Sequence, residues 1–345
     1  MAASSAVDLP PNTSQAPLML WLIWAMTAVA AVIIALRLFT SVTVLRKISL
    51  SDYLVVAALI FGIACNALFT VSAHFGLGRH IFYLTTKQLV ATFKFLVIAQ
   101  PFGMVSPMFG RMSLATYLLQ LVGPWKLNRY ILYLVIGLEM LVNLVSVILY
   151  TSQCGTHPTE LWNIQGPAAG HYCLARSYAT NFDYFQGSFN TLVDLVLTFI
   201  PMKLVISLKL RPRIKAGLMV LLGLSLLASV ASILRTYQLS VLIKSVDFTR
   251  TSVPFAIWYN IENFVVIVAA SIPTIRPLFT QHKNQQPGSS ATPLSYSTSG
   301  DRSHGHDKSA EMGFGGIGAG NNRPMIMRSD TWDVSRELTP EADNT

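Results

Sequence analysis

The chain has 345 residues, 52% hydrophobic and 12% charged, whereas a soluble domain averages about 25% charged residues. This composition excludes a generally disordered chain and indicates a protein solvated largely by lipid. The formal net charge of +9 does not indicate a nucleic-acid binder, because the excess lies in the apolar part. Residues 1–280 hold 19 basic and 8 acidic side chains, and residues 281–345 hold 6 and 8.

Seven stretches are long and apolar enough to cross a bilayer, which needs about 20 residues of helix. We therefore predict an all-α, seven-transmembrane helix bundle over 18–280. Residues 1–17 carry no Lys or Arg, so the first apolar run is interpreted as a retained helix and not as a signal peptide. The predicted spans are 18–44, 50–73, 93–122, 129–151, 183–208, 214–242 and 253–279.

The distribution of Lys and Arg predicts the orientation, because cytoplasmic loops carry an excess of them. The loops assigned inside include Arg46, Lys126 and the basic run 209–215, and the inner flank of the last span adds Arg276. The N-terminal tail has neither residue type. The sequence thus predicts an extracellular N-terminus and a cytoplasmic C-terminus, with Asn12 as a glycosylation candidate in Asn12-Thr13-Ser14.

The three cysteines are too few for a disulfide scaffold and lack the spacing of a metal site. Cys154 and Cys173 share the loop between the fourth and fifth spans, which is assigned to the oxidising side, and we predict a disulfide between them. Cys65 lies within an apolar span and is interpreted as a packing residue.

Residues 281–345 differ in composition from the rest, with a Ser/Thr/Gly run and the glycine-rich stretch 313–320. Such a segment buries too little apolar surface to offset its ordering entropy. It is predicted to be a disordered cytoplasmic tail. His304 and His306 are interpreted as solvated side chains, and no metal site is predicted.

Polar residues inside the spans fall on regular stripes, and ionisable residues in a membrane usually face a bundle interior or a cavity. Two readings stay open: a ligand cavity that opens outward, or interhelical clamps that only hold the bundle. We expect Arg111 to pair with Glu139 or Asp194, and Arg235 to meet Glu262 or the outer vestibule. The cavity candidates are Arg111, Glu139, Asn143, Asn190, Asp194, Arg235 and Glu262. The inner-face charges are Arg37 and Asp52, expected to pair, and Arg276.

Several activities lack their sequence signals. Retinal needs a lysine in the seventh span, and residues 251–279 contain none, so no cofactor is predicted. The Asp-Arg-Tyr and Asn-Pro-x-x-Tyr motifs of class A receptors do not occur in the third and seventh spans. No phosphate-binding loop, zinc-protease or hydrolase motif is found, and no enzymatic activity is predicted.

An ordered set of motifs resembles the fungal rhodopsin-like integral membrane proteins, which include the Pth-type receptors proposed for surface sensing in plant-pathogenic fungi. The resemblance covers about 18–280 and implies a seven-helix protein with receptor-like topology. One departure is Gln120, near which many members carry a basic residue. The matching pieces are 36–40, 50–54, 76–80, 107–113, 153–155, 185–194, 232–236 and 271–279, with Trp162, Cys173, Pro201, Trp258 and Glu262.

The sequence therefore favours an orphan receptor-like protein of the plasma membrane that senses an extracellular small molecule or surface cue. Its predicted partners are the lipid bilayer, an unidentified small-molecule ligand and a cytoplasmic signalling protein, with no nucleic acid. A transporter or channel for a small metabolite is the first alternative, and a membrane-bound enzyme without a recognisable motif is the second.

Overall fold

The computed structural model describes most of the predicted membrane domain. Residues 1–12 of the predicted N-terminal tail, with Asn12, and the predicted cytoplasmic tail beyond residue 281 lie outside the described residues, as does the side chain of Arg276. The described residues are 13–121, 126–155, 158–162, 173, 176–207 and 212–281.

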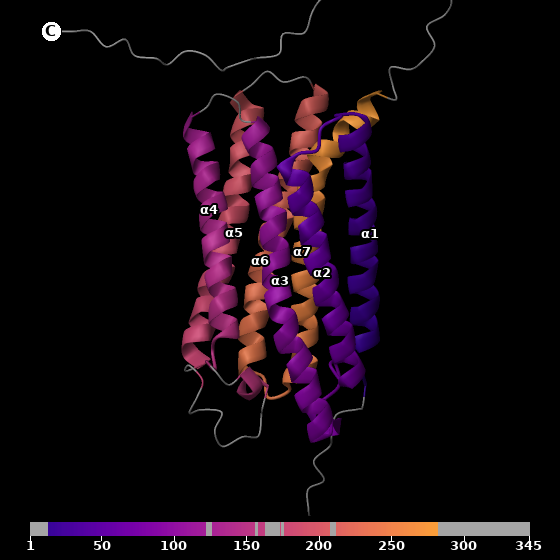
Figure 1. Ribbon diagram of the computed structural model, residues 1–345, viewed down its shortest axis with the longest axis vertical. Helices are drawn as coiled ribbons and strands as arrows, with labels where there is room; N and C mark the ends of the chain where they lie inside the picture. The colour runs from indigo at the N-terminus through magenta and orange to yellow at the C-terminus, as the bar shows by residue number, and fades with distance from the viewer. Residues whose placement is uncertain are drawn as a thin grey trace, which may run out of the picture. The chain divides into compact units, whose positions relative to one another are not determined.

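Within this part the chain is all-α, as predicted, and seven long helices run side by side in one bundle (Figure 1). Two 3-10 turns, Ile81–Tyr83 and Pro158–Leu161, lie in the connections after the second and fourth helices. The helices are α1 Ala16–Thr43, α2 Leu50–Phe75, α3 Thr86–Leu121, α4 Lys126–Thr151, α5 Arg176–Ser207, α6 Pro212–Lys244 and α7 Phe248–Gln281.

Three helices begin five or more residues earlier than the apolar pattern predicts. α3 starts at Thr86 and not at 93, α5 at Arg176 and not at 183, and α7 at Phe248 and not at 253. A hydropathy pattern ends where the chain becomes polar, whereas a helix can continue beyond the lipid. All three extensions lie at the end of the bundle that carries Cys154 and Cys173, called here the disulfide end.

Six of the seven helices are long and apolar enough to cross a membrane, which makes this a multi-pass membrane protein. α5 falls short by composition although the sequence predicts a span there. Its buried face carries Gln186, Asn190, Asp194 and Thr198, which lower its hydropathy because they serve the interior of the bundle.

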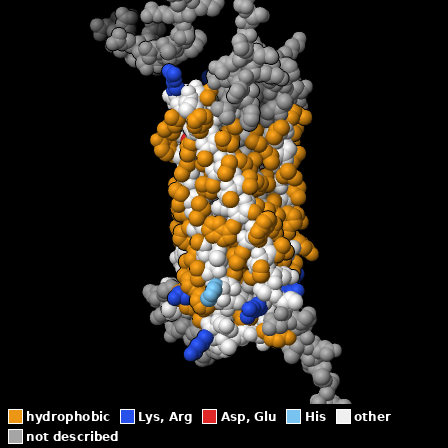
Figure 2. Space-filling model, turned by 90° about the vertical axis from the view of Figure 1, so that its right-hand side faces the viewer, with side chains coloured by type: hydrophobic (Ala, Val, Ile, Leu, Met, Phe, Trp, Pro, Cys, Tyr) orange, Lys and Arg blue, Asp and Glu red, His pale blue; other side chains and the backbone are white. Residues whose placement is uncertain are grey.

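The burial pattern is inverted relative to that of a soluble protein. Large apolar side chains such as Trp21, Ile60 and Leu192 are more than half exposed, while Arg111 and Glu262 are buried. On the face seen in Figure 2, hydrophobic side chains form a broad belt, and the Lys and Arg side chains visible there lie at its two ends. Such a belt matches the hydrocarbon layer of a bilayer.

The helices follow one another around the bundle, and α7 is the most enclosed. α7 packs against α1, α2, α3 and α6, and 67% of its most apolar window is buried, against 22–33% in the other five spanning candidates. α3 contacts α2, α4, α5 and α7. Polar residues on α3 and α7 therefore meet in the interior.

Candidate functional site

Arg111 of α3 is the centre of a buried charge network. Its Nε and Nη2 donate to the two carboxylate oxygens of Asp194 at 2.9 and 3.1 Å, a bidentate pair between α3 and α5. Nη2 also donates to Glu262 of α7 at 2.5 Å, and Nη1 reaches Glu139 of α4 at 3.5 Å. All four side chains are at most 4% exposed. The pairing expected for Arg111 is thus observed with both predicted partners.

Arg235 of α6 joins the same network through Glu262. Its Nε lies 3.2 Å from Glu262 Oε2, so one α7 carboxylate is shared by two guanidinium groups. Asn143 donates to the backbone oxygen of Glu139 at 2.8 Å and accepts from Gln186 of α5 at 2.8 Å. The network therefore ties together five helices, α3 to α7.

Small residues allow these helices to approach. Gly187 of α5 faces Thr236 of α6, and a Cβ at Gly187 would lie only 2.3 Å from the Thr236 hydroxyl. Ser225, Ser229 and Ser232 of α6 are buried, as the small-residue stripe predicts. The close contact between α5 and α6 places Asp183 and Arg235 around one space near the disulfide end.

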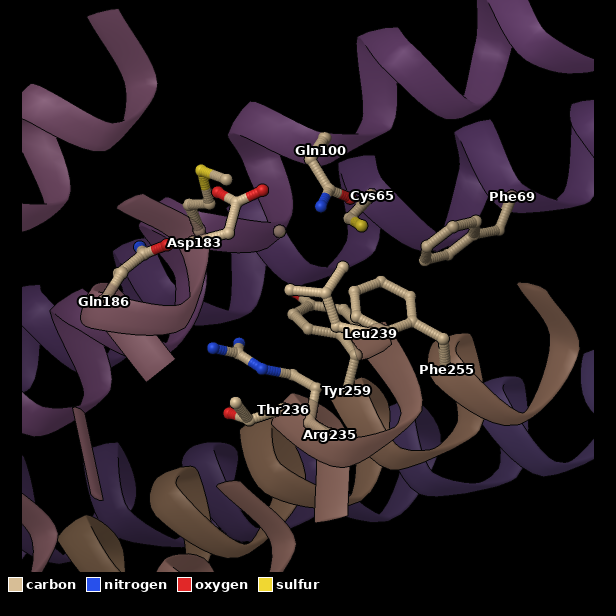
Figure 3. Close-up of a pocket in the computed structure, with 12 residues that line it drawn as sticks. Cys65, Phe69, Gln100, Asp183, Gln186, Arg235, Thr236, Leu239, Phe255 and Tyr259 are labelled. Atoms are coloured by element: carbon tan, nitrogen blue, oxygen red, sulfur yellow. The ribbon is translucent and has the colours of Figure 1, made fainter. Parts of the chain in front are cut away.

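That space is a pocket between α2, α3, α5, α6 and α7 (Figure 3). The charged and amide side chains of α5 and α6 lie on one side of the view, and the rings of Phe69 and Phe255 lie on the other. Its described lining is Cys65, Phe69, Gln100, Gly103, Met104, Asp183, Gln186, Arg235, Thr236, Leu239, Phe255 and Tyr259.

Of the seven residues predicted for a ligand cavity, only Arg235 lines this pocket. Arg111, Glu139, Asp194 and Glu262 form the network beneath it, and Asn143 is bound to that network. Asn190 is buried one turn from Asp194, and its Oδ1 has no partner among the described residues. A ligand-contact role for these six stays a prediction, and the geometry of Arg111, Glu139, Asp194, Glu262 and Asn143 is that of interhelical clamps.

The pocket lining includes residues that the stripe argument did not select. Phe69, Phe255 and Tyr259 resemble ordinary apolar positions in the sequence, and Gln100 precedes the proline at 101 in a mildly apolar run. Asp183 carried a usable signal, because it shares the polar face of α5 with Asn190 and Asp194.

At the opposite end of the bundle, Arg37 and Asp52 pair as predicted. Arg37 Nε donates to Asp52 Oδ1 at 2.8 Å, and Nη2 donates to the Ser51 hydroxyl at 2.8 Å. Nη1 donates to the backbone oxygen of Ala270 in α7. The fully buried guanidinium thus fastens α1 to α2 and α7.

The disulfide end carries a second group of contacts, which the sequence did not reveal. His80, after α2, lies 2.5 Å from Asp247, before α7, and Arg250 of α7 lies 2.6 Å from the other ring nitrogen of His80. These contacts hold the connection between α2 and α3 against the start of α7.

Cys154 and Cys173 form the predicted disulfide, and Cys65 is free and buried. The bridge closes the connection between α4 and α5, in which Trp162 lies under the Lys94 ammonium of α3 at 5.7 Å from the ring centroid. The disulfide therefore closes the connection just beyond the end of α4, and Trp162 holds it against α3.

Replacing Cys154 and Cys173 by serine is expected to lower the free energy of unfolding by about 3 kcal/mol, the loop-closure value for a crosslink of this span. Reductant should lower the melting temperature of the wild-type protein and leave the double serine variant unchanged. A Cys65→Ser variant serves as the control, since it should keep the sensitivity to reductant. Equal melting temperatures of the wild-type protein with and without reductant would contradict the expectation.

Comparison with known proteins agrees with this architecture. The family described as "Fungal rhodopsin domain" matches residues 36–281, which include α2 to α7 and the end of α1. The chain belongs to this family. A curated member from Metarhizium anisopliae, "Polyenoic acids biosynthesis gene cluster protein Ba17b", is 27% identical over 278 residues, or 73% of this chain and 71% of the relative. No solved structure matches the chain at a significant level.

The fungal rhodopsin domain here does not fit a retinal cofactor. A retinal Schiff base needs a lysine amine that projects into the bundle, and α7 contains no lysine from Phe248 to Gln281. Lys94 of α3 is exposed and lies against Trp162. The residues that line the pocket include no lysine either. We therefore derive no light-dependent step for this protein.

Proposed function

We propose that this protein is an orphan seven-transmembrane receptor that binds an extracellular small molecule in the pocket at the disulfide end. The observation that carries the proposal is the link between pocket and network. Arg235 lines the pocket and also lies 3.2 Å from Glu262, which Arg111 binds at 2.5 Å. A ligand that moves Arg235 would change the ion pairs between α3 and α7, and thereby the packing of two central helices.

The packing at the opposite end favours a receptor over a transporter. Beside the buried Arg37–Asp52 pair, the interior there contains an apolar cluster that includes Val55, Leu118, Leu132 and Leu221, all at most 1% exposed. A transport path needs polar groups or water across the full depth of the bundle. The polar groups of this pocket instead meet an apolar layer below the Arg111 network.

An enzymatic role receives no support from the pocket chemistry. Its described lining holds one thiol, Cys65, and no histidine. Nucleophilic catalysis pairs the nucleophile with a base within hydrogen-bond reach.

We infer that the protein lies in the plasma membrane with the disulfide end outside the cell. In this arrangement α5 also crosses the membrane, which brings the number of spans to seven. The loops and helix ends at the other end carry more Lys and Arg than those at the disulfide end, and a disulfide forms in an oxidising compartment. In this orientation the pocket faces the exterior and the basic connection between α5 and α6 faces a cytoplasmic signalling partner.

A reporter fused after Phe279 should then lie in the cytosol, and Asn12 should acquire a glycan. Both follow from an odd number of spans with an extracellular N-terminus. The location of the reporter is measured by its protection from protease in intact cells. The glycan at Asn12 is measured by a shift in gel mobility after deglycosylation. A reporter that is accessible from outside would overturn the orientation or the span count.

The relative from Metarhizium anisopliae is named for a polyenoic acid biosynthesis gene cluster. That name associates a family member with small-molecule metabolism, and it supports a small metabolite as the class of cue for this protein.

The proposal is tested by ligand-dependent stabilisation of the purified full-length protein, because a ligand that binds only the folded state raises its melting temperature. A metabolite library is screened on the wild-type protein and on Gly103→Val, in which the side chain fills the pocket beside Cys65 and Tyr259. Gly137→Val is the matched control, since Gly137 has open space around it on an exposed face of α4.

Compounds that bind in the pocket should stabilise the wild-type protein and Gly137→Val, and not Gly103→Val. Hits that stabilise all three proteins equally, or a screen with no hits, would count against the proposed function.

A further inference from the structure

We propose that the pocket selects a small organic ammonium ion, whose charged group binds Asp183 and whose apolar body lies against Phe69, Phe255 and Tyr259. This inference rests on the proposed function, because it names the class of the ligand for the same pocket. Four observations lead to it: a carboxylate without a partner, the charge balance, the ring positions and the size of the space.

Asp183 presents a carboxylate to the pocket. Asp183 lines the pocket, and Figure 3 shows its carboxylate turned away from Gln186, on the side of the pocket where Gln100 lies. Among the described residues no hydrogen bond or ion pair to Asp183 is found, and its only charged neighbour is Arg235, beyond ion-pair distance. Asp183 is half-buried, and a carboxylate that is partly removed from water without a partner is stabilised by a cation in the space beside it.

The charge balance of the interior points the same way. The pocket and the network beneath it contain two guanidinium groups, Arg111 and Arg235. They contain four carboxylates: Asp183, Glu139, Asp194 and Glu262. An entering cation reduces the excess of negative charge, whereas an entering carboxylate increases it.

Arg235 does not convert the pocket into an anion site. Its Nε faces Glu262 Oε2 at 3.2 Å, and Asp183 lies on the pocket side of the same guanidinium (Figure 3). Two acidic groups thus compete with any anion for this one cation.

The side of the pocket opposite the charges fits the body of an alkylammonium ion. Phe69 and Tyr259 lie edge to face with ring centroids 6.3 Å apart, and Phe255 lies beside them (Figure 3). Ring faces attract ammonium groups and their alkyl substituents. The Tyr259 hydroxyl, 4% exposed by residue and next to the Cys65 thiol, has no oxygen or nitrogen partner among the described residues and can accept an N–H.

The free space limits the size of the ligand, and the side chains around it favour an organic cation over a bare metal ion. The cavity volume is about 30 Å³, enough for one or two water molecules or an ammonium headgroup. Within the described part of the chain, no three His, Cys, Asp or Glu side chains are placed to hold a metal together. The ammonium headgroup of a small alkylammonium ion fits this space and needs no set of metal ligands.

The test compares three probes of matched carbon skeleton: isobutylammonium, isobutyrate and isobutanol. Their dissociation constants are measured by thermal-shift titration of the full-length protein in detergent, at constant ionic strength. Isobutylammonium should bind at least about tenfold more tightly than either analogue, the factor expected when a charged hydrogen bond is made or lost.

Asp183→Asn should weaken the binding of isobutylammonium by about tenfold or more and leave the affinity for isobutanol unchanged. Glu139→Gln is the matched control: it removes one carboxylate from the same interior but does not line the pocket, and it should change the affinity by less than about threefold. If Asp183→Asn does not fold, Phe255→Leu replaces it in the test, since it removes a ring and no charge. This variant should weaken the binding of isobutylammonium more than the binding of isobutanol.

Tighter binding of isobutyrate, abolished by Arg235→Gln, would overturn the ammonium assignment and leave the receptor proposal standing. Equal loss of affinity in Asp183→Asn and Glu139→Gln would also overturn it, because the effect would then be one of net charge and not of the pocket carboxylate. Absence of pocket-dependent hits in the metabolite screen is the separate result that counts against the proposed function itself.

Discussion

Arg111→Gln is expected to be among the most destabilising single substitutions in this protein, at about 3–5 kcal/mol, because it leaves buried carboxylates without their cation. Asp194, Glu139 and Glu262 all lie within 3.5 Å of the guanidinium. After the substitution only Arg235 remains for three buried acidic groups. Folding and surface expression should therefore collapse.

The surplus of carboxylates makes the effects of the partners unequal. Asp194→Asn should cost less, about 1.5–3 kcal/mol, the value of hydrogen bonds to a charged group, since Glu262 and Glu139 still compensate Arg111. Glu139→Gln should be nearly neutral. Glu139 is the most distant partner, at 3.5 Å, and its Oε2 has no partner among the described residues.

The melting temperatures of the purified variants, with surface expression as a second readout, test this order. Adding Asp194→Asn to Arg111→Gln should recover part of the lost stability, because it removes one uncompensated charge. If Asp194→Asn proves as damaging as Arg111→Gln, the network is a simple pair and the surplus has no energetic effect.

Much of the fold follows from the sequence because lipid imposes a simple rule. Each span needs a long apolar stretch, and the polar residues that interrupt it turn inward. This rule leads to the helix count, to the Arg37–Asp52 pair and to Arg111 with its acidic partners. The disulfide between Cys154 and Cys173 follows once both cysteines are assigned to one extracellular loop.

The pocket could not be predicted in the same way. Its lining depends on the relative rotation and height of five helices, and those are set by packing such as that of Gly187 against Thr236. The apolar members of the lining, Phe69 and Phe255, have the same pattern as lipid-facing or core residues. Asp183 shares a polar face with Asn190 and Asp194 but is the first residue of the predicted fifth span, and Gln100 lies in a mildly apolar part of the third.

Arg37→Gln and Asp52→Asn are expected to cost about 3–5 kcal/mol each, because at this end of the bundle one buried cation faces one buried carboxylate. Arg37 is fully buried and Asp52 is 2% exposed, with 2.8 Å between Arg37 Nε and Asp52 Oδ1. Either substitution leaves the other charge unpaired. The double variant should therefore be more stable than either single one.

The asparagine at 52 can still accept the backbone N–H of Ser49, which Asp52 Oδ2 binds at 3.0 Å. The start of α2 is thus preserved, and the stability lost in Asp52→Asn measures the contribution of the carboxylate charge. Ser51→Ala is the control: it removes a single hydrogen bond to Arg37 and should cost about 1 kcal/mol.

A double-mutant cycle on Arg37 and Asp52 measures their coupling free energy. Strong coupling here, beside weak coupling of Arg111 to Glu139, would reflect the different ratios of cations to carboxylates at the two sites. If Arg37→Gln is as mild as Ser51→Ala, the prediction is wrong, and the bond from Arg37 to the Ala270 carbonyl of α7 contributes little to the packing of that helix.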